Sequence, residues 1–391
     1  IMNKVEIHNL TNLPKKSNTN LVEIPLSKPS ITDKEIKYIN DALKDGWADK
    51  KNYYVKKFEE NLARKIGVRF AVATSSCTGA LHLGLAALGL KEGDEVIVPE
   101  TSWIASVSPI KHLGAKPIFV DICEDSWCIN PKLIEKVINA KTRAIIPVHL
   151  YGNVCELGEL KAISKRHSIP IIEDAAEGLG SYYSGRHVGS FGLFSVFSFH
   201  GSKTITTGEG GALLTNNEAL YEKVKILNEH GRSSKSNKQY WPEELGYKFK
   251  ISNLQAALGC AQIERCEEII GRKREILGFY KDYFSQYSSI SFNPEPEGTV
   301  NGAWMPTAVF SKESGISARS MIKDLGANNI DARSFFWPLS SLNFFEAVEE
   351  NIISRDIQKR AINLPSFFDI TREDLIRVCS IIESRLKNVN K

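Results

Sequence analysis

One lysine lies in a segment where solvation alone does not explain it. Lys203 falls within FSFHGSKTITTGEGGALLT, residues 197–215, between an apolar run and a cluster of small, hydroxyl and glycine residues. A lysine amine withdrawn from water loses its charge readily, and the neutral amine can attack a carbonyl carbon to form a Schiff base. The segment therefore predicts that Lys203 reacts with a carbonyl group, while the glycines allow the backbone to turn sharply beside it.

Three further groups with matching chemistry follow other apolar runs. Asp174 ends the run IPIIED, Trp103 follows EVIVPETS, and residues 75–83, SSCTGALHL, place hydroxyl groups and free amides at a predicted helix start. A helix start of this kind binds anions, a flat ring stacks on another ring, and a carboxylate can hold a positive charge on a ring nitrogen. Taken singly, each group also has a plain structural explanation, which is helix capping for Asp174 and the serines and core packing for Trp103.

Together the four parts match what pyridoxal 5'-phosphate requires. Its aldehyde needs a lysine, its phosphate needs a helix start, and its ring nitrogen needs a carboxylate that keeps it protonated. Their joint occurrence in one chain favours the functional interpretation over four separate structural ones. We expect this cofactor, with pyridoxamine 5'-phosphate as its aminated form in the half-reaction, and no metal ion.

Buried strands that alternate with helices would bring these residues together. Continuous apolar runs predict strands buried on both faces, and the segments between them have helical spacing. The predicted strands are FAVAT, EVIVP, PIFVD, AIIPVH, IPIIED, LFSVFSF and GALLT. This alternation predicts an α/β fold with a mostly parallel sheet flanked by helices, which binds its ligand at the carboxyl ends of the strands.

The alternation ends at residues 251–284, whose amphipathic pattern predicts one long helix. We expect three parts along the chain. A loose N-terminal arm takes residues 1–22, a large cofactor-binding α/β domain takes 23–271, and a small C-terminal domain takes 272–391.

The composition is that of an ordinary globular enzyme. The chain has 391 residues, 42% hydrophobic and 25% charged, with a formal net charge of +4. The charge is small and no basic run is interleaved with aromatic residues, so we expect no nucleic-acid partner. No apolar run approaches the roughly 18 residues that span a bilayer. Seven scattered cysteines without a CxxC pair favour a reducing compartment, so we expect a cytoplasmic protein that binds no membrane.

Four longer stretches resemble a known family. They are ATSSCTGALHLGLAALGLKEGDEVIVPETSWIASV, PVHLYGN, IIEDAAEGLGS and FSFHGSKTITTGEGGALLT. They are similar to the nucleotide-sugar aminotransferases of the fold type I pyridoxal phosphate group, and the resemblance extends from about Ile24 to Ser384. It implies a mostly parallel central sheet flanked by helices, with a smaller C-terminal α+β domain.

The resemblance also implies roles for individual residues. Lys203 is implied to be the catalytic lysine, which bonds the cofactor and moves the proton. The implied cofactor-binding residues are Ser76, Cys77, Thr78, Trp103, Asp174, Glu177, Ser198, Lys203 and Asn253. Asn253 would reach the phosphate of a neighbouring subunit, so the expected enzyme is a homodimer with composite sites. The expected substrate-binding residues are Arg333, Tyr240, Trp241 and His200.

The implied reaction moves an amino group from L-glutamate to C4 of a nucleotide-linked 4-keto-6-deoxy sugar, for O-antigen or another glycan. Amination at C3 and a dTDP- or UDP-linked substrate remain open, because Lys250, Ser334 and Ser340 depart from the family pattern near the expected substrate. Deoxygenation at C3 is disfavoured, since family members that catalyse it carry histidine where this chain keeps Lys203. A non-catalytic binding protein on the same fold is the alternative from another class.

Overall fold

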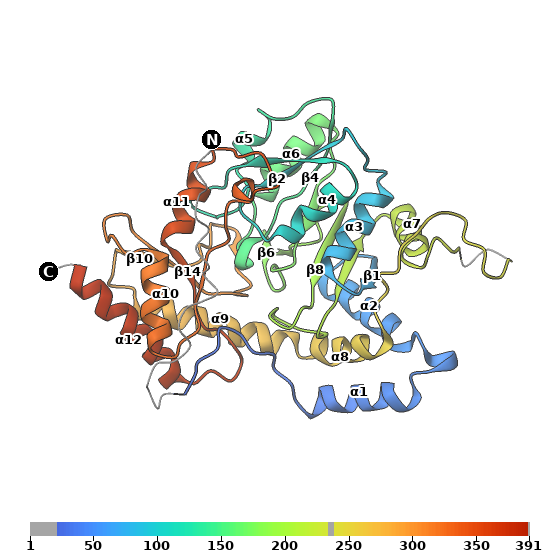
Figure 1. Cartoon of the computed structure of the whole chain (residues 1–391). Coiled ribbons are helices and arrows are strands. Elements are labelled where there is room, and N and C mark those ends of the chain that lie inside the picture. Colours follow the sequence, from blue (N-terminus) through green and yellow to red (C-terminus); the bar gives the residue numbers. More distant parts are fainter. Residues whose placement is uncertain (1–21, 234–237, 390–391) are drawn as a thin grey trace.

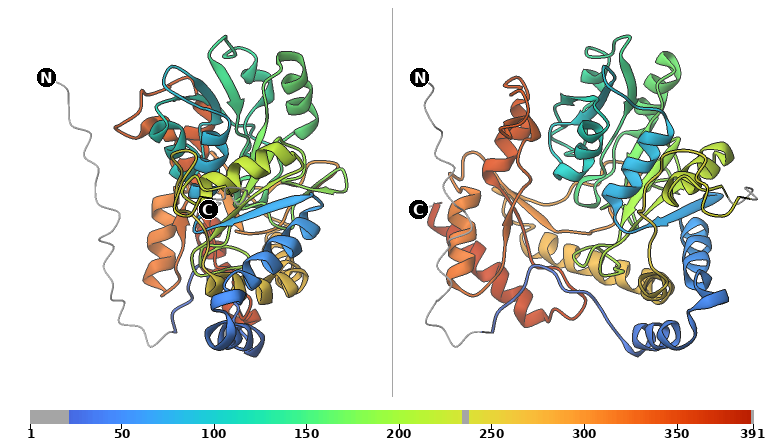
Figure 2. Two further views of the ribbon diagram at one scale, coloured as in Figure 1. Left: turned by 90° about the vertical axis from the view of Figure 1, so that its right-hand side faces the viewer. Right: turned by 45° about the vertical axis from the view of Figure 1, so that its right-hand side comes forward.

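The computed structural model describes residues 22–233 and 238–389 (Figure 1). The predicted N-terminal arm therefore lies almost wholly outside the described residues. In the part that is described, the chain forms a large layered α/β unit, from which two consecutive helices lead to a smaller group of helices and short strands (Figure 2).

The large sheet has seven strands in the order β3-β2-β4-β5-β8-β9-β1, with two parallel bridges, Ile145–Ile171 and Val148–Asp174, joining β4 to β5. All of its strands run parallel except β9, which pairs antiparallel with both of its neighbours. The predicted mostly parallel sheet is confirmed. Its strands are β1 (Phe70–Thr74), β2 (Glu95–Pro99), β3 (Lys116–Val120), β4 (Thr142–Ile145), β5 (Ile172–Asp174), β8 (Phe194–Ser198) and β9 (Gly211–Thr215).

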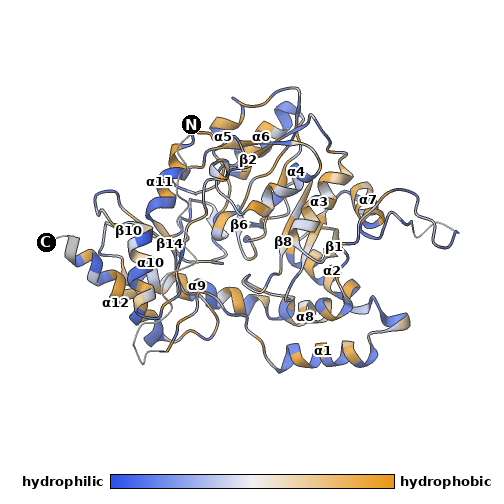
Figure 3. Ribbon diagram, viewed as in Figure 1, coloured by the Kyte–Doolittle hydropathy of each residue, from blue (hydrophilic) through white to orange (hydrophobic). Residues whose placement is uncertain are grey.

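Successive residues of each strand pack into different cores, because side chains alternate between the two faces of a sheet. In β9, Leu214 joins the core on one face, whereas Leu213 joins the core on the other. This burial on both faces explains why the strands are continuous apolar runs, and strands β1 and β8 are coloured largely as apolar in Figure 3.

Helices cover both faces of the large sheet. The core on one face includes apolar residues of α2 (Tyr53–Ile66), α6 (Leu157–His167) and α8 (Asn253–Glu264). The other core includes residues of α3 (Cys77–Ala87), α4 (Ser108–His112) and α7 (Glu218–Asn228). Helix α1 (Asp33–Asp45) packs on α8, and the remaining short helices are η2 (Ala48–Lys50), η3 (Ile104–Ser106), α5 (Pro131–Ile134), η4 (Leu150–Gly152) and η5 (Leu339–Ser341).

The predicted long helix over 251–284 is wrong in one respect, because it is two helices. Helix α8 ends at Glu264, α9 (Cys266–Tyr283) begins at Cys266, and Arg265 between them has φ −101° and ψ 5°. The Arg265 guanidinium pairs with the buried Glu35 carboxylate at 3.0 Å and donates to the Ser30 carbonyl at 3.2 Å. A tertiary ion pair of this kind is invisible in the helical periodicity.

The C-terminal part is built on a small antiparallel sheet in the order β10-β12-β14-β13. Its core combines the second half of α9 with later helices and with Ile24 from the start of the described chain. The elements are β10 (Ile290–Ser291), β12 (Thr307–Phe310), α10 (Ala318–Ala327), β13 (Arg333–Ser334), α11 (Ile352–Arg360), β14 (Ala361–Asn363) and α12 (Arg372–Val389). A third small sheet links β6 (Tyr182–Tyr183) to β7 (Arg186–His187) and β11 (Thr299–Val300). In the described residues, no helix is long and apolar enough to cross a membrane.

Candidate active site

A cavity of about 440 Å³ lies at the carboxyl ends of the large sheet's strands. Residues of the C-terminal part and the segment at Leu26 and Ser27 close it from other sides. The structure brings ten of the predicted residues together in its lining, namely Ser76, Cys77, Thr78, Trp103, Asp174, Glu177, Ser198, His200, Lys203 and Arg333.

Lys203 follows β8 in a turn that its own amide closes on the His200 carbonyl at 2.9 Å. Its side chain is 15% exposed, and Nζ lies 3.3 Å from Glu177 Oε1. On another side, Nζ lies 3.8 Å from the ring centre of Trp304, which places the ammonium over an aromatic face. The amine is thus held between a carboxylate and an indole at the cavity wall.

Asp174 ends β5 and is buried with its carboxylate in the cavity lining. Ser106 Oγ donates to Oδ2 at 2.7 Å, and the Ala176 amide donates to Oδ1 at 3.1 Å. Two donors therefore hold the carboxylate in one orientation. A carboxylate held in this way can accept the N–H of a protonated ring nitrogen.

Glu177 is the second buried carboxyl group of the cavity. The Tyr151 amide donates to Glu177 Oε2 at 2.7 Å, from a residue whose φ of 56° lies in the left-handed region. Burial raises the pKa of Glu177, and the nearby Lys203 ammonium opposes part of that rise. The position of Glu177 therefore depends on a strained backbone at Tyr151.

The start of α3 has the features of an anion-binding site. Ser76 caps the helix by accepting the Gly79 amide at 3.0 Å, which leaves the Cys77 and Thr78 amides without an intrahelical acceptor. A Cβ at Gly211 would overlap the Cys77 backbone, so only glycine lets β9 run this close. Burial raises the pKa of the Cys77 thiol well above its usual range, so it adds no negative charge against a phosphate.

Trp103 stands at the cavity opening. It precedes η3, is 60% exposed, and lies with its ring centre 6.0 Å from that of Phe336. His200 also lies at the rim, where Nδ1 faces Ser202 Oγ at 2.9 Å and Nε2 faces Glu209 at 3.5 Å.

Three predicted residues do not line the cavity of their own chain. Asn253 begins α8, accepts the Tyr54 amide at 2.9 Å and donates to the Gly46 carbonyl at 3.1 Å. Tyr240 and Trp241 are 82% and 57% exposed on the loop between α7 and α8. The predicted role of Asn253 involves a neighbouring subunit, and the predicted roles of all three residues stay predictions.

Several lining residues were missed by the sequence reasoning. They are Ser106, Trp304, Met305, Phe336, Asn363 and the Leu26–Ser27 segment. Ser106 follows Trp103 closely, so its hydroxyl at a strand-to-helix turn is a usable signal. Trp304 and Asn363 lie far along the chain in segments without a local motif, and only the tertiary fold brings them to Lys203.

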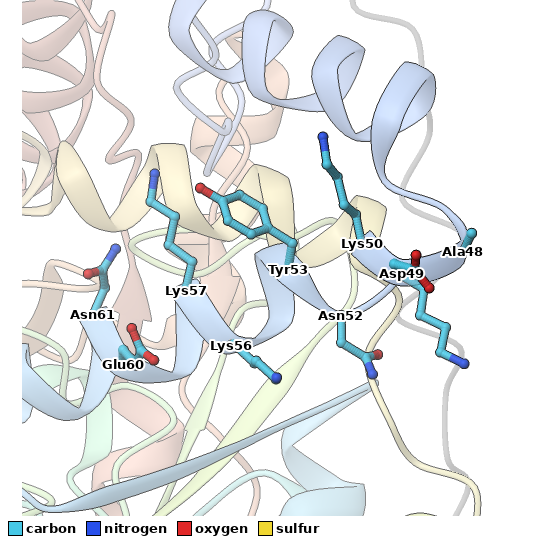
Figure 4. A pocket seen from close by; sticks show the side chains of 10 residues that line it. Ala48, Asp49, Lys50, Asn52, Tyr53, Lys56, Lys57, Glu60 and Asn61 are labelled. Atoms are coloured by element: carbon cyan, nitrogen blue, oxygen red, sulfur yellow. The ribbon is translucent and has the colours of Figure 1, made fainter.

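A larger hollow elsewhere on the surface lacks this chemistry. It measures about 800 Å³, lies at the start of α2 and is lined by Lys50, Tyr53, Lys57 and their neighbours (Figure 4). Of these two hollows, only the 440 Å³ cavity combines a lysine, two buried carboxyl groups, a helix start and aromatic side chains. Its residues fit pyridoxal phosphate.

Comparison with known proteins agrees with this site. Residues 29–383 match the model of the DegT/DnrJ/EryC1/StrS aminotransferase family. A GDP-perosamine synthase of Escherichia coli O157:H7 is 39% identical over 360 residues, which covers 92% of this chain and 97% of the relative. A GDP-perosamine synthase of Vibrio cholerae is 35% identical over 364 residues, covering 92% and 98%.

Solved structures give the same result. The pyridoxal phosphate form of a putative sugar aminotransferase, Spr1654 from Streptococcus pneumoniae, is 28% identical and superposes with a TM-score of 0.87, covering 94% of this chain and all of that chain. Fold and site thus define a pyridoxal phosphate-dependent aminotransferase of fold type I. The chain belongs to the DegT/DnrJ/EryC1/StrS family of sugar aminotransferases.

Proposed function

We propose that this enzyme moves an amino group from L-glutamate to C4 of a nucleotide-linked 4-keto-6-deoxy sugar, as a step in the synthesis of O-antigen or another surface glycan. Support comes from the two GDP-perosamine synthases that match nearly the whole chain. The observation that carries the chemistry is the placement of Lys203 and Asp174 in one cavity. Amination at C3, or of a dTDP- or UDP-linked sugar, is the alternative.

Different residues of the cavity would bind the cofactor ring, bind its phosphate and transfer the proton. Pyridoxal phosphate, when bound, supplies an aldehyde and an electron-accepting ring. Asp174, oriented by Ser106, would hold the ring nitrogen, and the Cys77 and Thr78 amides with Ser198 would hold the phosphate. Lys203 Nζ would accept and return a proton at the substrate carbon that bears the amino group. Glu177, 3.3 Å from Nζ, would keep the lysine amine at the cavity wall.

The mouth of the cavity suits a substrate that carries negatively charged phosphate groups. Arg333 lies there with a side chain that is 71% exposed and is paired only loosely, at 3.6 Å, with Asp331. Guanidinium groups of this kind bind phosphate oxygens, whereas Trp103, 60% exposed at the cavity opening, is proposed to stack on the cofactor ring. We propose that Arg333 binds the diphosphate of the nucleotide sugar.

A second subunit completes the proposed site. Helix α1 and the segment after it expose Ile36, Leu43, Trp47 and Tyr53, which are 51%, 49%, 60% and 55% exposed. We propose that a second copy of the chain covers this face, which would bring Asn253, Tyr240 and Trp241 to the partner's cavity. All seven cysteines are unpaired, which suits our proposal of a cytoplasmic enzyme.

Absorbance spectra with a substrate panel test the proposed function. Purified protein should carry a visible band that L-glutamate bleaches, and Lys203→Ala should lack both the band and the response. Bleached enzyme should regain the band with GDP-4-keto-6-deoxymannose, and the C4-aminated product should be found by mass spectrometry and NMR. Recovery only with a dTDP- or UDP-linked sugar, or amination at C3, would overturn the proposed substrate while leaving the reaction class intact.

A further inference from the structure

Lys273 is a buried lysine of α9 that no carboxylate neutralises within the described residues. It is 5% exposed, and its Nζ donates to the Trp304 carbonyl at 3.2 Å and the Ser366 carbonyl at 2.5 Å. Burial lowers the pKa of Lys273 to about 7. An amine in such a place is costly to the fold, because desolvation opposes its charge and no counter-ion offsets that loss.

The first carbonyl belongs to a residue that touches the catalytic lysine. The Trp304 ring centre lies 3.8 Å from Lys203 Nζ, and its Nε1 donates to the Ser202 carbonyl at 2.9 Å. Trp304 is therefore held at its side chain by the Lys203 segment and at its backbone by Lys273.

The second carbonyl belongs to Ser366, which contacts another wall of the cavity. Ser366 follows β14, and its amide donates to the carbonyl of Leu26, which lines the cavity, at 2.8 Å. Tyr280, two turns after Lys273 on the same face of α9, donates its hydroxyl to the adjacent Pro365 carbonyl at 3.0 Å. Among the residues that the structure describes, the buried Ser366 hydroxyl has no hydrogen-bond partner, and the contacts of Ser366 with Lys273 and Leu26 are made by its backbone.

We propose that Lys273 is a positioning residue for Lys203: its ammonium joins the Trp304 segment to the Ser366 segment and so fixes the indole on which Lys203 Nζ rests. The proposal rests on the proposed role of Lys203 in binding the cofactor. Its effect reaches Lys203 only through Trp304, since Lys273 contacts the carbonyl of that residue and not the amine.

Lys273→Met tests the proposal, because methionine has a similar length and cannot donate a hydrogen bond. We expect kcat to fall on the order of tenfold, as for small misplacements of a reacting group. The pH midpoint of the visible band should also shift down, since the displaced indole no longer favours a charged Nζ. In the apoprotein, amide hydrogen exchange around Trp304 and Ser366 should accelerate. Lys281→Met, on the exposed face of the same helix, is the matched control and should change none of these.

A double-mutant cycle separates positioning from general stability. If Lys273 acts through the indole, the double variant Lys273→Met/Trp304→Leu should have the same kcat and the same pH midpoint as Trp304→Leu alone. A lowered melting temperature with an unchanged pH midpoint, or fully additive losses, would overturn the proposal. Should Lys273→Met not fold, Lys273→Gln, which keeps a single amide donor, is read in the same way.

Failure of the proposed function would look different. Wild-type protein that binds no cofactor at Lys203 would refute the role of that lysine. The exchange measurement on the apoprotein would then still decide whether Lys273 holds Trp304, and unchanged exchange in Lys273→Met would overturn the inference.

Discussion

At the scale of single residues, the two buried carboxyl groups and the lysine of the cavity are each held by a neighbour. Ser106 and the Ala176 amide hold Asp174, the Tyr151 amide holds Glu177, and Glu177 in turn lies beside Lys203. Partners of this kind limit how far a reacting group wanders, so they affect rate more than binding.

Ser106→Ala should lower kcat by about 10- to 100-fold, because Asp174 loses its donor at Oδ2. The cofactor should still bind, since the phosphate site and Lys203 are untouched. Ser195→Ala is the control, because it also removes one buried hydroxyl hydrogen bond, to the Gly189 carbonyl, but away from the cavity. Steady-state kinetics and melting curves compare the two, and equal losses of kcat would contradict the role given to Ser106.

Local motifs predicted one half of the site and missed the other. Asp174 ends β5, Lys203 lies in the turn after β8 and Thr78 lies in the first turn of α3 after β1, so their placement follows from the strand pattern. Trp304 and Asn363 belong to the C-terminal sheet region, and nothing in their own neighbourhood indicates a ligand. Contacts between segments this distant depend on how the two parts of the chain pack, which spacing does not encode.

At the scale of elements, the position of the phosphate site depends on how tightly α3 packs on the sheet. A Cβ at Gly84 would lie 2.8 Å from Leu213 Cδ1 and closer still to the Phe194 ring. The absence of a side chain there lets the helix approach β8 and β9. At the other end of this contact, Gly211 at the start of β9 lies against Ser76 and Cys77 at the start of α3.

Gly84→Ala should destabilise the protein by about 1–3 kcal/mol, because the added methyl overpacks the α3–sheet contact. Gly271→Ala is the matched control in α9, where the same methyl meets open space. It should stabilise the protein by about 0.5–1 kcal/mol through helix propensity alone. Urea unfolding measures both, and equal shifts of the two variants would refute the packing argument.

The turn between Gly180 and β7 should make the fold sensitive to acid. His187 is buried, accepts the Gly180 amide at Nε2 over 2.9 Å, and has a pKa lowered by burial from 6.5 to about 4. In the unfolded chain, His187 binds a proton below about pH 6.5, whereas in the folded chain it does so only near pH 4. The stability contributed by neutral His187 is thus present above pH 6.5 and is lost as the pH falls toward 4.

We expect this site to remove on the order of 3 kcal/mol of stability between pH 6.5 and 4. His187→Gln should flatten the pH dependence in that window, and His230→Asn, at an exposed position whose φ of 62° suits asparagine, should not. Unfolding free energies across the range measure the slopes. A wild-type slope retained in His187→Gln would show that other groups cause the acid sensitivity.

The elements themselves were largely predictable, and the exception has a tertiary cause. Strands β2 and β8 are continuous apolar runs because both faces are buried, and both were predicted within one residue at each end, whereas β4 ends earlier and β5 begins later than their predicted runs. The break at Arg265 was not, since it depends on an ion pair with Glu35 in α1, far away in the sequence.

At the scale of the whole molecule, the exposed face of α1 should determine the oligomeric state. Trp47→Glu places a charge in the proposed interface and should convert a dimer into monomers, with loss of activity. Ile352→Glu changes a residue that is similarly exposed, at 67%, on α11 and should leave the dimer intact. Light scattering after size exclusion measures the mass, and a monomeric wild-type enzyme with full activity would refute the composite site.

The pairing of the Ile24 segment with the C-terminal part has a consequence for how the protein folds during synthesis. Ile24 exchanges backbone hydrogen bonds with Asn329 and Asp331, and the Leu26 carbonyl accepts the Ser366 amide. During translation, the segment that carries Ile24 and Leu26 is made before Asn329, Asp331 and Ser366, its backbone partners in the C-terminal part. The large sheet can form during translation, yet the wall at Leu26 is fixed to the C-terminal part only after Ser366 has been made. A nascent chain that stalls before Ile330 would therefore hold Lys203 in a folded sheet that is still open to water.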